Sequence, residues 1–213
     1  MRQEYVMSKF RKPLVILAVA ALACGGLAAG AALADTPVTL TVGHASGECA
    51  VSWQKDGIGF VALPAGSSAR SIGVSDGVGT ISADLSQFAN PGALAKTVTF
   101  VGTFKAHFVL YNSSGGYVEL SDGQATLPAG PGNLLVKTGS NPSGTRMSVF
   151  DYAKTPTITA ERASMVPPSL AFKVGDVQMS VTAEFAKVVN DNLGAGTIEA
   201  GTRFGTCSAE ISS

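Results

Sequence analysis

Ser75 lies in a motif that serine hydrolases use to present their nucleophile. Residues 73–77 (GVSDG) match G-x-S-x-G, in which a strand delivers the serine into a sharp turn before a helix that supplies an oxyanion donor. Here residues 78–82 continue as a strand-like run, and the downstream histidine, His107, precedes the candidate acid Asp151. The pattern favours a hairpin turn at this point, and Ser75 with His107 stays a candidate pair for hydrolysis.

The other histidines and carboxylates form no pattern that is typical of a catalytic or metal site. His44 and His107 are distant from each other and from the cysteines in sequence, with no spacing typical of zinc ligands. The carboxylates are scattered, so the two acids of a glycosidase cannot be selected. Residues 190–192 (NDN) lack the full ligand run of a calcium loop and predict a polar turn. We expect no metal ion.

Residues 57–62 (GIGFVA) satisfy the letters of the G-x-G-x-x-A dinucleotide fingerprint. That fingerprint must end a strand and open a helix whose N-terminus holds the pyrophosphate. This segment has strand character and is stopped by Pro64. We therefore expect no cofactor, and the sequence assigns no catalytic residue.

The first 34 residues have the features of a secretory signal peptide. A basic cluster at residues 9–12 precedes an unbroken apolar run, Leu14–Cys24, of the length of a signal-peptide h-region. The small side chains of Ala32 and Ala34 predict cleavage after Ala34. The chain is therefore expected to divide into a leader, residues 1–34, and an exported domain, residues 35–213.

Other outcomes for this N-terminal segment stay open. Residues 14–34 carry no charge and are long enough for an uncleaved membrane anchor. Lipoprotein processing at Cys24 is a second alternative. The start at Met1 or at Met7 is also undecided.

Removing the leader changes the charge of the chain. The chain has 15 basic and 15 acidic residues; the leader holds four of the basic and one of the acidic ones, so 11 and 14 remain and the net charge becomes −3. That balance excludes a polybasic protein that binds nucleic acid or membrane surfaces. We expect a periplasmic, secreted or cell-surface domain with no stable membrane insertion.

Cys49 and Cys207 predict one disulfide that links the start of the domain to its end. Without Cys24 they form an even pair, which in an exported chain is typical of a disulfide. Two buried free thiols are the alternative. Trp53, the single tryptophan, falls on the Cys49 face of its strand. It predicts core packing near the disulfide, or alternatively a role in binding.

Apolar residues alternate with polar ones along most of the domain, which predicts β-strands with one buried face. In the longest run, Thr97–Tyr111, Gly102 predicts a bulge or bend. Asp56-Gly57, Asp76-Gly77 and Asp122-Gly123 suit the positive-φ positions of type I′ hairpins. The predicted strands are residues 38–42, 49–53, 58–63, 71–74, 80–84, 97–111, 117–120, 124–127, 134–137, 146–152, 157–162, 169–174 and 197–207.

Helical pattern is nearly absent from the domain. A short helix is expected around Pro91–Lys96, and a strand is favoured up to Phe185, followed by an irregular or helical turn that Gly194 stops. The predicted fold class is all-β: a single antiparallel β-sandwich or jelly-roll-like domain after an N-terminal signal peptide.

Abundant strand signals without a cluster of catalytic groups favour a non-enzymatic protein. The leading prediction is an exported envelope or extracellular protein that acts as a structural, adhesive or binding module. Its partners would be itself, other surface proteins or glycans, met by strand addition at a sheet edge. The alternatives are a secreted hydrolase, using Ser75 or an unrecognised carboxylate pair, and a carrier of an apolar ligand between its sheets. A deep pocket would favour one of the alternatives.

Overall fold

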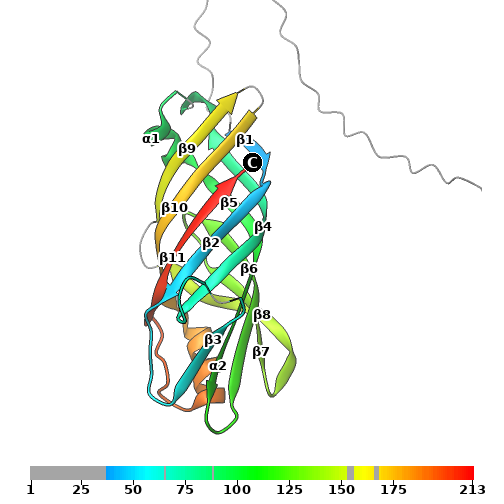
Figure 1. Ribbon diagram of the computed structural model, residues 1–213, viewed down its shortest axis with the longest axis vertical. Helices are drawn as coiled ribbons and strands as arrows, with labels where there is room; N and C mark the ends of the chain where they lie inside the picture. Colours follow the sequence, from blue (N-terminus) through cyan, green and yellow to red (C-terminus); the bar gives the residue numbers. More distant parts are fainter. Residues whose placement is uncertain (1–36, 65, 88, 153–155, 166–167) are drawn as a thin grey trace, which may run out of the picture. The chain divides into compact units, whose positions relative to one another are not determined.

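Antiparallel β-strands form one 11-stranded sheet that closes into a ring (Figure 1). The structure, a computed structural model, describes residues 37–64, 66–87, 89–152, 156–165 and 168–213, so the predicted leader lies outside the described residues. No helix in these ranges is long and apolar enough to cross a membrane. The strands are β1 (Pro37–Thr41), β2 (His44–Val51), β3 (Ile58–Ala62), β4 (Ser71–Asp84), β5 (Thr99–Asn112), β6 (Tyr117–Leu127), β7 (Gly132–Thr138), β8 (Asn141–Tyr152), β9 (Thr157–Met165), β10 (Pro168–Val181) and β11 (Arg203–Ser212).

Each of the three longest strands, β4, β5 and β10, pairs with two different strands along the same side, and this allows the ring to close. β4 pairs with β1 and then β2, β5 pairs with β4 and then β3, and β10 pairs with β9 and then β8. The closed circuit runs β4-β2-β11-β10-β8-β7-β6-β5 and back to β4. The predicted all-β antiparallel class is confirmed. In a sandwich the core lies between two sheets, whereas here a single closed sheet surrounds it.

A pair of glycines lies at the seam where β4 meets β5. Gly79 and Gly102 are register partners. A Cβ on Gly79 would lie 2.2 Å from the carbonyl oxygen of Val101, and one on Gly102 would lie 2.4 Å from that of Val78. Because both obstructing atoms belong to the backbone, side chains larger than hydrogen cannot be accommodated without moving a strand. The closure of the ring therefore depends on glycine at both positions.

Two of the three Asp-Gly pairs form bulges inside long strands, so the predicted hairpins at these positions were wrong. Asp76 and Asp122 have φ values of 50° and 48°, and the strand registers shift beside them. β4 and β6 therefore continue through these pairs, since the positive φ that suits a hairpin also suits a bulge. Asp56-Gly57 does form a turn, with φ 78° at Gly57, but the strands on either side of it do not pair with each other.

Strand β5 confirms the alternating pattern of its sequence. Phe100, Phe104 and Phe108 lie on its inner face. Val101, Thr103 and Lys105 are exposed on its outer face. Its register against β6 shifts between Phe104 and His107. The bulge that was predicted at Gly102 therefore lies further along the strand.

Helix α2 (Ala183–Leu193) begins where a continuing strand was predicted, so the prediction of strand up to Phe185 was wrong. β10 ends at Val181, and the Thr182 hydroxyl accepts a hydrogen bond from the backbone N–H of Phe185 at 3.2 Å. This N-cap starts a helix where the apolar spacing alone fitted a strand equally well. Gly194 ends the helix as predicted, and its N–H donates to the carbonyl of Asn190.

Helix α1 (Pro91–Thr97) confirms the predicted short helix. Pro91 occupies its first turn, and the Asn90 side chain accepts a hydrogen bond from Ala93 N–H at 3.1 Å. Leu94 is fully buried. The one-turn 3₁₀ helix η1 (Leu85–Gln87) joins β4 to this segment.

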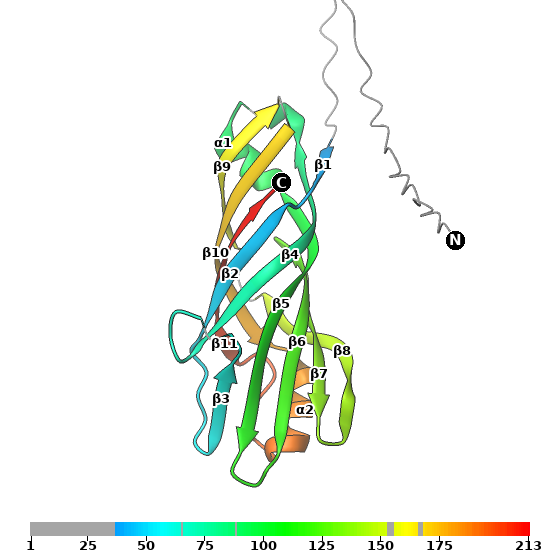
Figure 2. The ribbon, with the colours of Figure 1, turned by 45° about the vertical axis from the view of Figure 1, so that its right-hand side comes forward.

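Buried apolar side chains inside the ring form two clusters. The α2-end cluster includes Phe150 and Phe185, and the α1-end cluster includes Leu94 and Phe172. Figures 1 and 2 show the two helices at opposite ends of the ring. The core is therefore divided along the ring rather than continuous.

Substituting Gly79 tests the seam. We expect Gly79→Ala to lower the free energy of unfolding by about 2–3 kcal/mol, the upper part of the range for overpacking, because its Cβ would meet the backbone of β5. Urea denaturation measures the loss. Gly175→Ala on β10 is the matched control: nothing lies within 4 Å of its added Cβ, and we expect a change within about 0.5 kcal/mol. Equal stabilities for the two variants would contradict the tight seam.

Candidate functional site

An apolar cavity of about 120 Å³ lies inside the ring. Residues from all eight strands of the closed circuit line it. Phe108 and Phe150 of its wall belong to the α2-end cluster, whereas Phe100 and Ile211 belong to the α1-end cluster. The cavity is therefore the gap between the two halves of the core.

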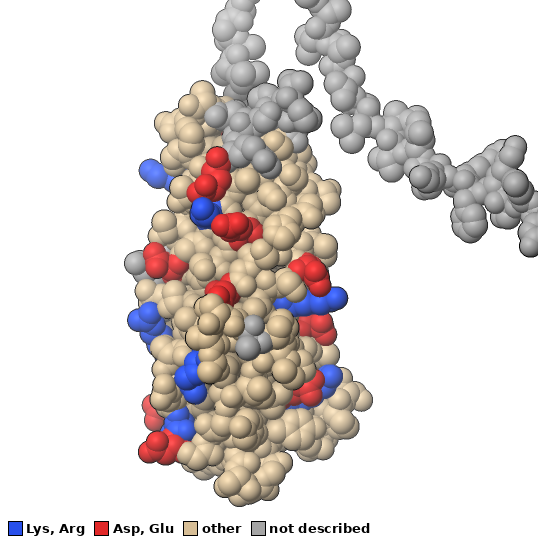
Figure 3. Space-filling model, viewed as in Figure 1, with Lys and Arg blue, Asp and Glu red and all other residues tan. Residues whose placement is uncertain are grey.

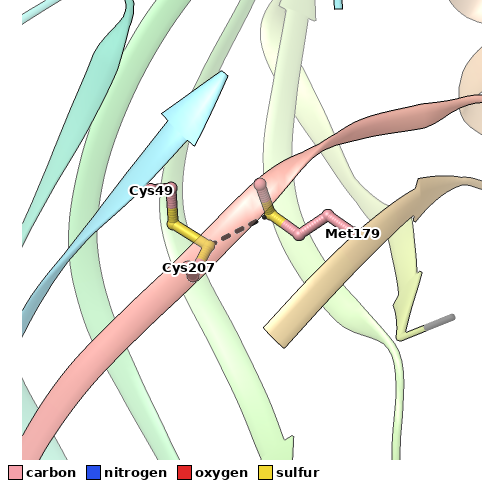
Figure 4. Close-up of a disulfide and its surroundings, with 3 residues drawn as sticks. All are labelled: Cys49, Met179 and Cys207. Carbon is pink, nitrogen blue, oxygen red and sulfur yellow. Dashed lines mark hydrogen bonds between the residues drawn. A yellow bond between two sulfur atoms is a disulfide. The ribbon is translucent and has the colours of Figure 1, made fainter. Parts of the chain in front are cut away.

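Three sulfur atoms form one wall of the cavity. Cys49 on β2 and Cys207 on β11 are register partners with Cα atoms 3.9 Å apart, and they are joined in the predicted disulfide. The Sδ of Met179 on β10 lies 3.3 Å from the Sγ of Cys207 (Figure 4). Because a disulfide sulfur carries no hydrogen, this is a contact between two polarizable atoms rather than a hydrogen bond.

Aromatic rings form the side of the cavity nearest to α2. The ring centroids of Phe108 and Phe150 lie 5.9 and 5.0 Å from that of Phe204, and the ring of Trp53 stacks on Phe204 at 5.8 Å. These spacings are typical of favourable aromatic pairs. Trp53, a candidate binding residue in the sequence, is buried in this cluster and does not line the cavity.

Small residues on β5 and β6, across the circuit from the sulfur atoms, leave the space open. Ala106 on β5 and Ala125 on β6 line the cavity. The ring of Phe104 covers Gly123 so closely that a Cβ there would lie 2.1 Å from it. Because methyl groups and covered backbone reach less far than larger side chains, the ring interior is not filled at this level.

The cavity wall exposes almost only carbon and sulfur. Tyr152, Ser46 and Ser208 are the lining residues with side-chain hydroxyls, but these hydroxyls add very little to the wall. Burial raises the pKa of Tyr152 to about 12, so the phenol is neutral at physiological pH. A wall of this chemistry gives a water molecule almost none of the two or more polar partners that it needs.

The residues of the hydrolase hypothesis do not line the cavity: Ser75 on β4 pairs with Lys105 on the neighbouring strand β5, two residues from His107. Ser75 is exposed on β4, and no hydrogen bond between described residues joins it to a histidine. His107 Nε2 lies 3.4 Å from Glu119 Oε1 without hydrogen-bond geometry, while His44 Nε2 bonds the Ser46 hydroxyl at 2.9 Å. Within the described ranges, no three His, Cys, Asp or Glu side chains gather closely enough to hold a metal ion.

A second hollow, of about 570 Å³, lies on the outer face of β2, β9, β10 and β11. Its charged groups already have partners. The Nζ atom of Lys173 lies 3.7 Å from Oε1 of Glu161 and 3.8 Å from Oε1 of Glu210. Hydrogen bonds lower the pKa of Glu48, the largest contribution coming from the Ser67 hydroxyl at 2.6 Å. Figure 3 shows acidic and basic side chains interspersed on this face. These paired charges indicate no particular ligand.

The comparisons with known proteins identify no family. No protein-family model matches the chain, and no curated protein matches it. Among solved structures, the chain is similar to the C-terminal domain of HtaA from Corynebacterium glutamicum, at 11% sequence identity and a TM-score of 0.43, over 81% of this chain and 98% of that one. A likeness at this level carries no inference about a ligand.

Sequence reasoning missed most residues of the cavity. Met179 and Ala106 occupy inward positions of alternating runs, which was the only available signal. Alternation predicts that a side chain points into the core, but not that small side chains of one strand face a gap shared with a distant strand. That information depends on the pairing of β4 with β5.

Removing the disulfide tests its part in the fold. We expect the double variant Cys49→Ala/Cys207→Ala to lose about 2–5 kcal/mol of unfolding free energy, because the cross-link restricts the unfolded chain. Urea denaturation with and without a dithiol reductant measures it. Reductant should destabilise the wild type and leave the variant unchanged; an equal effect on both would contradict a stabilising disulfide.

Proposed function

We propose that this protein is an exported, non-enzymatic binding protein that holds a small apolar molecule inside its ring. The cavity of about 120 Å³ between the two core clusters carries the proposal. A dry engineered cavity of about 150 Å³ lined by apolar side chains binds benzene or xenon. The space here has similar size and chemistry, so a molecule of about one six-membered ring fits it.

The disulfide supports export. Disulfides persist in oxidising compartments and are rare in the cytosol, and Cys49 and Cys207 are joined. A periplasmic, secreted or cell-surface location fits this observation and the predicted leader. Export would give the binding site access to molecules outside the cell.

The geometry gives less support to the other two hypotheses. Ser75 is exposed on β4 and makes no hydrogen bond to a described histidine, so the groups of a serine hydrolase are not assembled. Strand addition needs free sheet edges, and ring closure confines these, among the described strands, to β1, β3, β9 and the part of β8 before its pairing with β10. Binding inside the ring is therefore preferred over adhesion through an edge.

Filling the cavity tests the proposal. Without ligand, Ala106→Leu should gain about 0.5–2 kcal/mol, as cavity-filling substitutions do. Benzene at ten times its dissociation constant should stabilise the wild type by about 1.4 kcal/mol and should not stabilise Ala106→Leu. Unfolding measured in sealed cells gives both quantities.

Ala50→Leu is the matched control, because Ala50 is exposed on the outer face of β2. This variant should keep the benzene response of the wild type. A wild-type protein whose stability does not respond to benzene would contradict the proposal.

A further inference from the structure

The cavity lies at the end of an array of packed aromatic rings. Trp53 stacks on Phe204, and Phe204 in turn packs against Phe108 and Phe150 at centroid distances of 5.9 and 5.0 Å. Phe108 and Phe150 are the last rings of this array before the cavity, which they line. An aromatic molecule in the cavity would therefore meet rings at the 4.5–7 Å spacing that aromatic pairs prefer.

Further aromatic and sulfur groups surround the same space. Phe100 and Phe104 approach it from β5, and Met179 and the disulfide approach it from β10, β2 and β11. Thioether and disulfide sulfurs make favourable contacts with aromatic rings, often at the ring edge. A saturated hydrocarbon of equal size would fill the space but would make neither kind of contact.

The wall also selects against polar groups. Tyr152 exposes ring carbon rather than its hydroxyl to the cavity, since almost no polar surface faces the space. A hydroxyl on the bound molecule would lose its water and gain no partner. The site therefore favours a hydrocarbon over its phenolic analogue.

We infer that the ligand of this cavity is a single-ring aromatic hydrocarbon without hydrogen-bonding substituents, and that Met179 is a residue that sets its preference for aromatic over saturated rings. The inference rests on the proposed function, because it names the ligand class of the same site. Met179 is suited to this role because its flexible thioether lies beside the cavity and is held against Cys207 at 3.3 Å.

The test compares toluene, methylcyclohexane and phenol by calorimetric titration of the full exported protein in sealed cells. Dissociation constants are corrected for the transfer of each compound from water to alkane. The wild type should bind toluene about two- to tenfold more tightly than methylcyclohexane after this correction. The uncorrected dissociation constant of phenol should be at least about tenfold higher than that of toluene.

Two methionine variants isolate the contribution of the sulfur. Met179→Leu keeps the apolar volume but removes the thioether, so the corrected preference for toluene should fall by at least about twofold. Met147→Leu is the control, because Met147 packs against the α2-end cluster but does not line the cavity. This control should keep the wild-type preference.

The outcomes separate the two proposals. A preference for toluene that falls in Met179→Leu and not in Met147→Leu supports the inference. Equal corrected affinities for toluene and methylcyclohexane, or phenol binding as tightly as toluene, would overturn it and leave the proposed function standing. Failure of all three compounds to bind would overturn both.

Discussion

The pairing of β4 with β5 is the interaction on which the rest of the structure depends. An open sheet of these strands would expose one apolar face, whereas the closed circuit turns every inner face toward a common interior. The closure is possible because Gly79 and Gly102 meet at the seam, where added side chains would strike backbone atoms 2.2 and 2.4 Å away. Core, cavity and disulfide all lie inside the enclosure that this seam completes.

The enclosure also explains why the cavity persists. An empty space of 120 Å³ costs about 3 kcal/mol relative to a filled core, at about 24 cal/mol per Å³. The strands around it cannot collapse inward, because their hydrogen bonds to both neighbours fix the circumference of the ring. The disulfide between Cys49 and Cys207 further holds β2 to β11 at this level. A bound apolar molecule would recover part of that energy.

Much of the fold could be predicted from alternation, helix start and stop residues and the two cysteines. The inward face of Thr97–Tyr111, the disulfide and the helix after Asn90 all follow from local chemistry. The continuity of β4 and β6 did not, because Asp-Gly supplies the same positive φ to a bulge as to a hairpin. The start of α2 depended on Thr182, which the strand-like spacing of Val177, Met179 and Val181 obscured. The cavity could not be predicted, since it arises where Ala106 and Ala125 face the sulfur wall across the ring, and a sequence does not give distances across a closed sheet.

The central claim, that the ring contains a ligand site for small apolar molecules, is tested most directly by a crystal structure of the protein under xenon pressure. Xenon occupies dry apolar cavities of this size and has a strong anomalous signal. The account predicts a xenon peak inside the ring, in contact with Met179, Ala106 and Phe108. An interior without a peak at that level, with the ring otherwise unchanged, would contradict it.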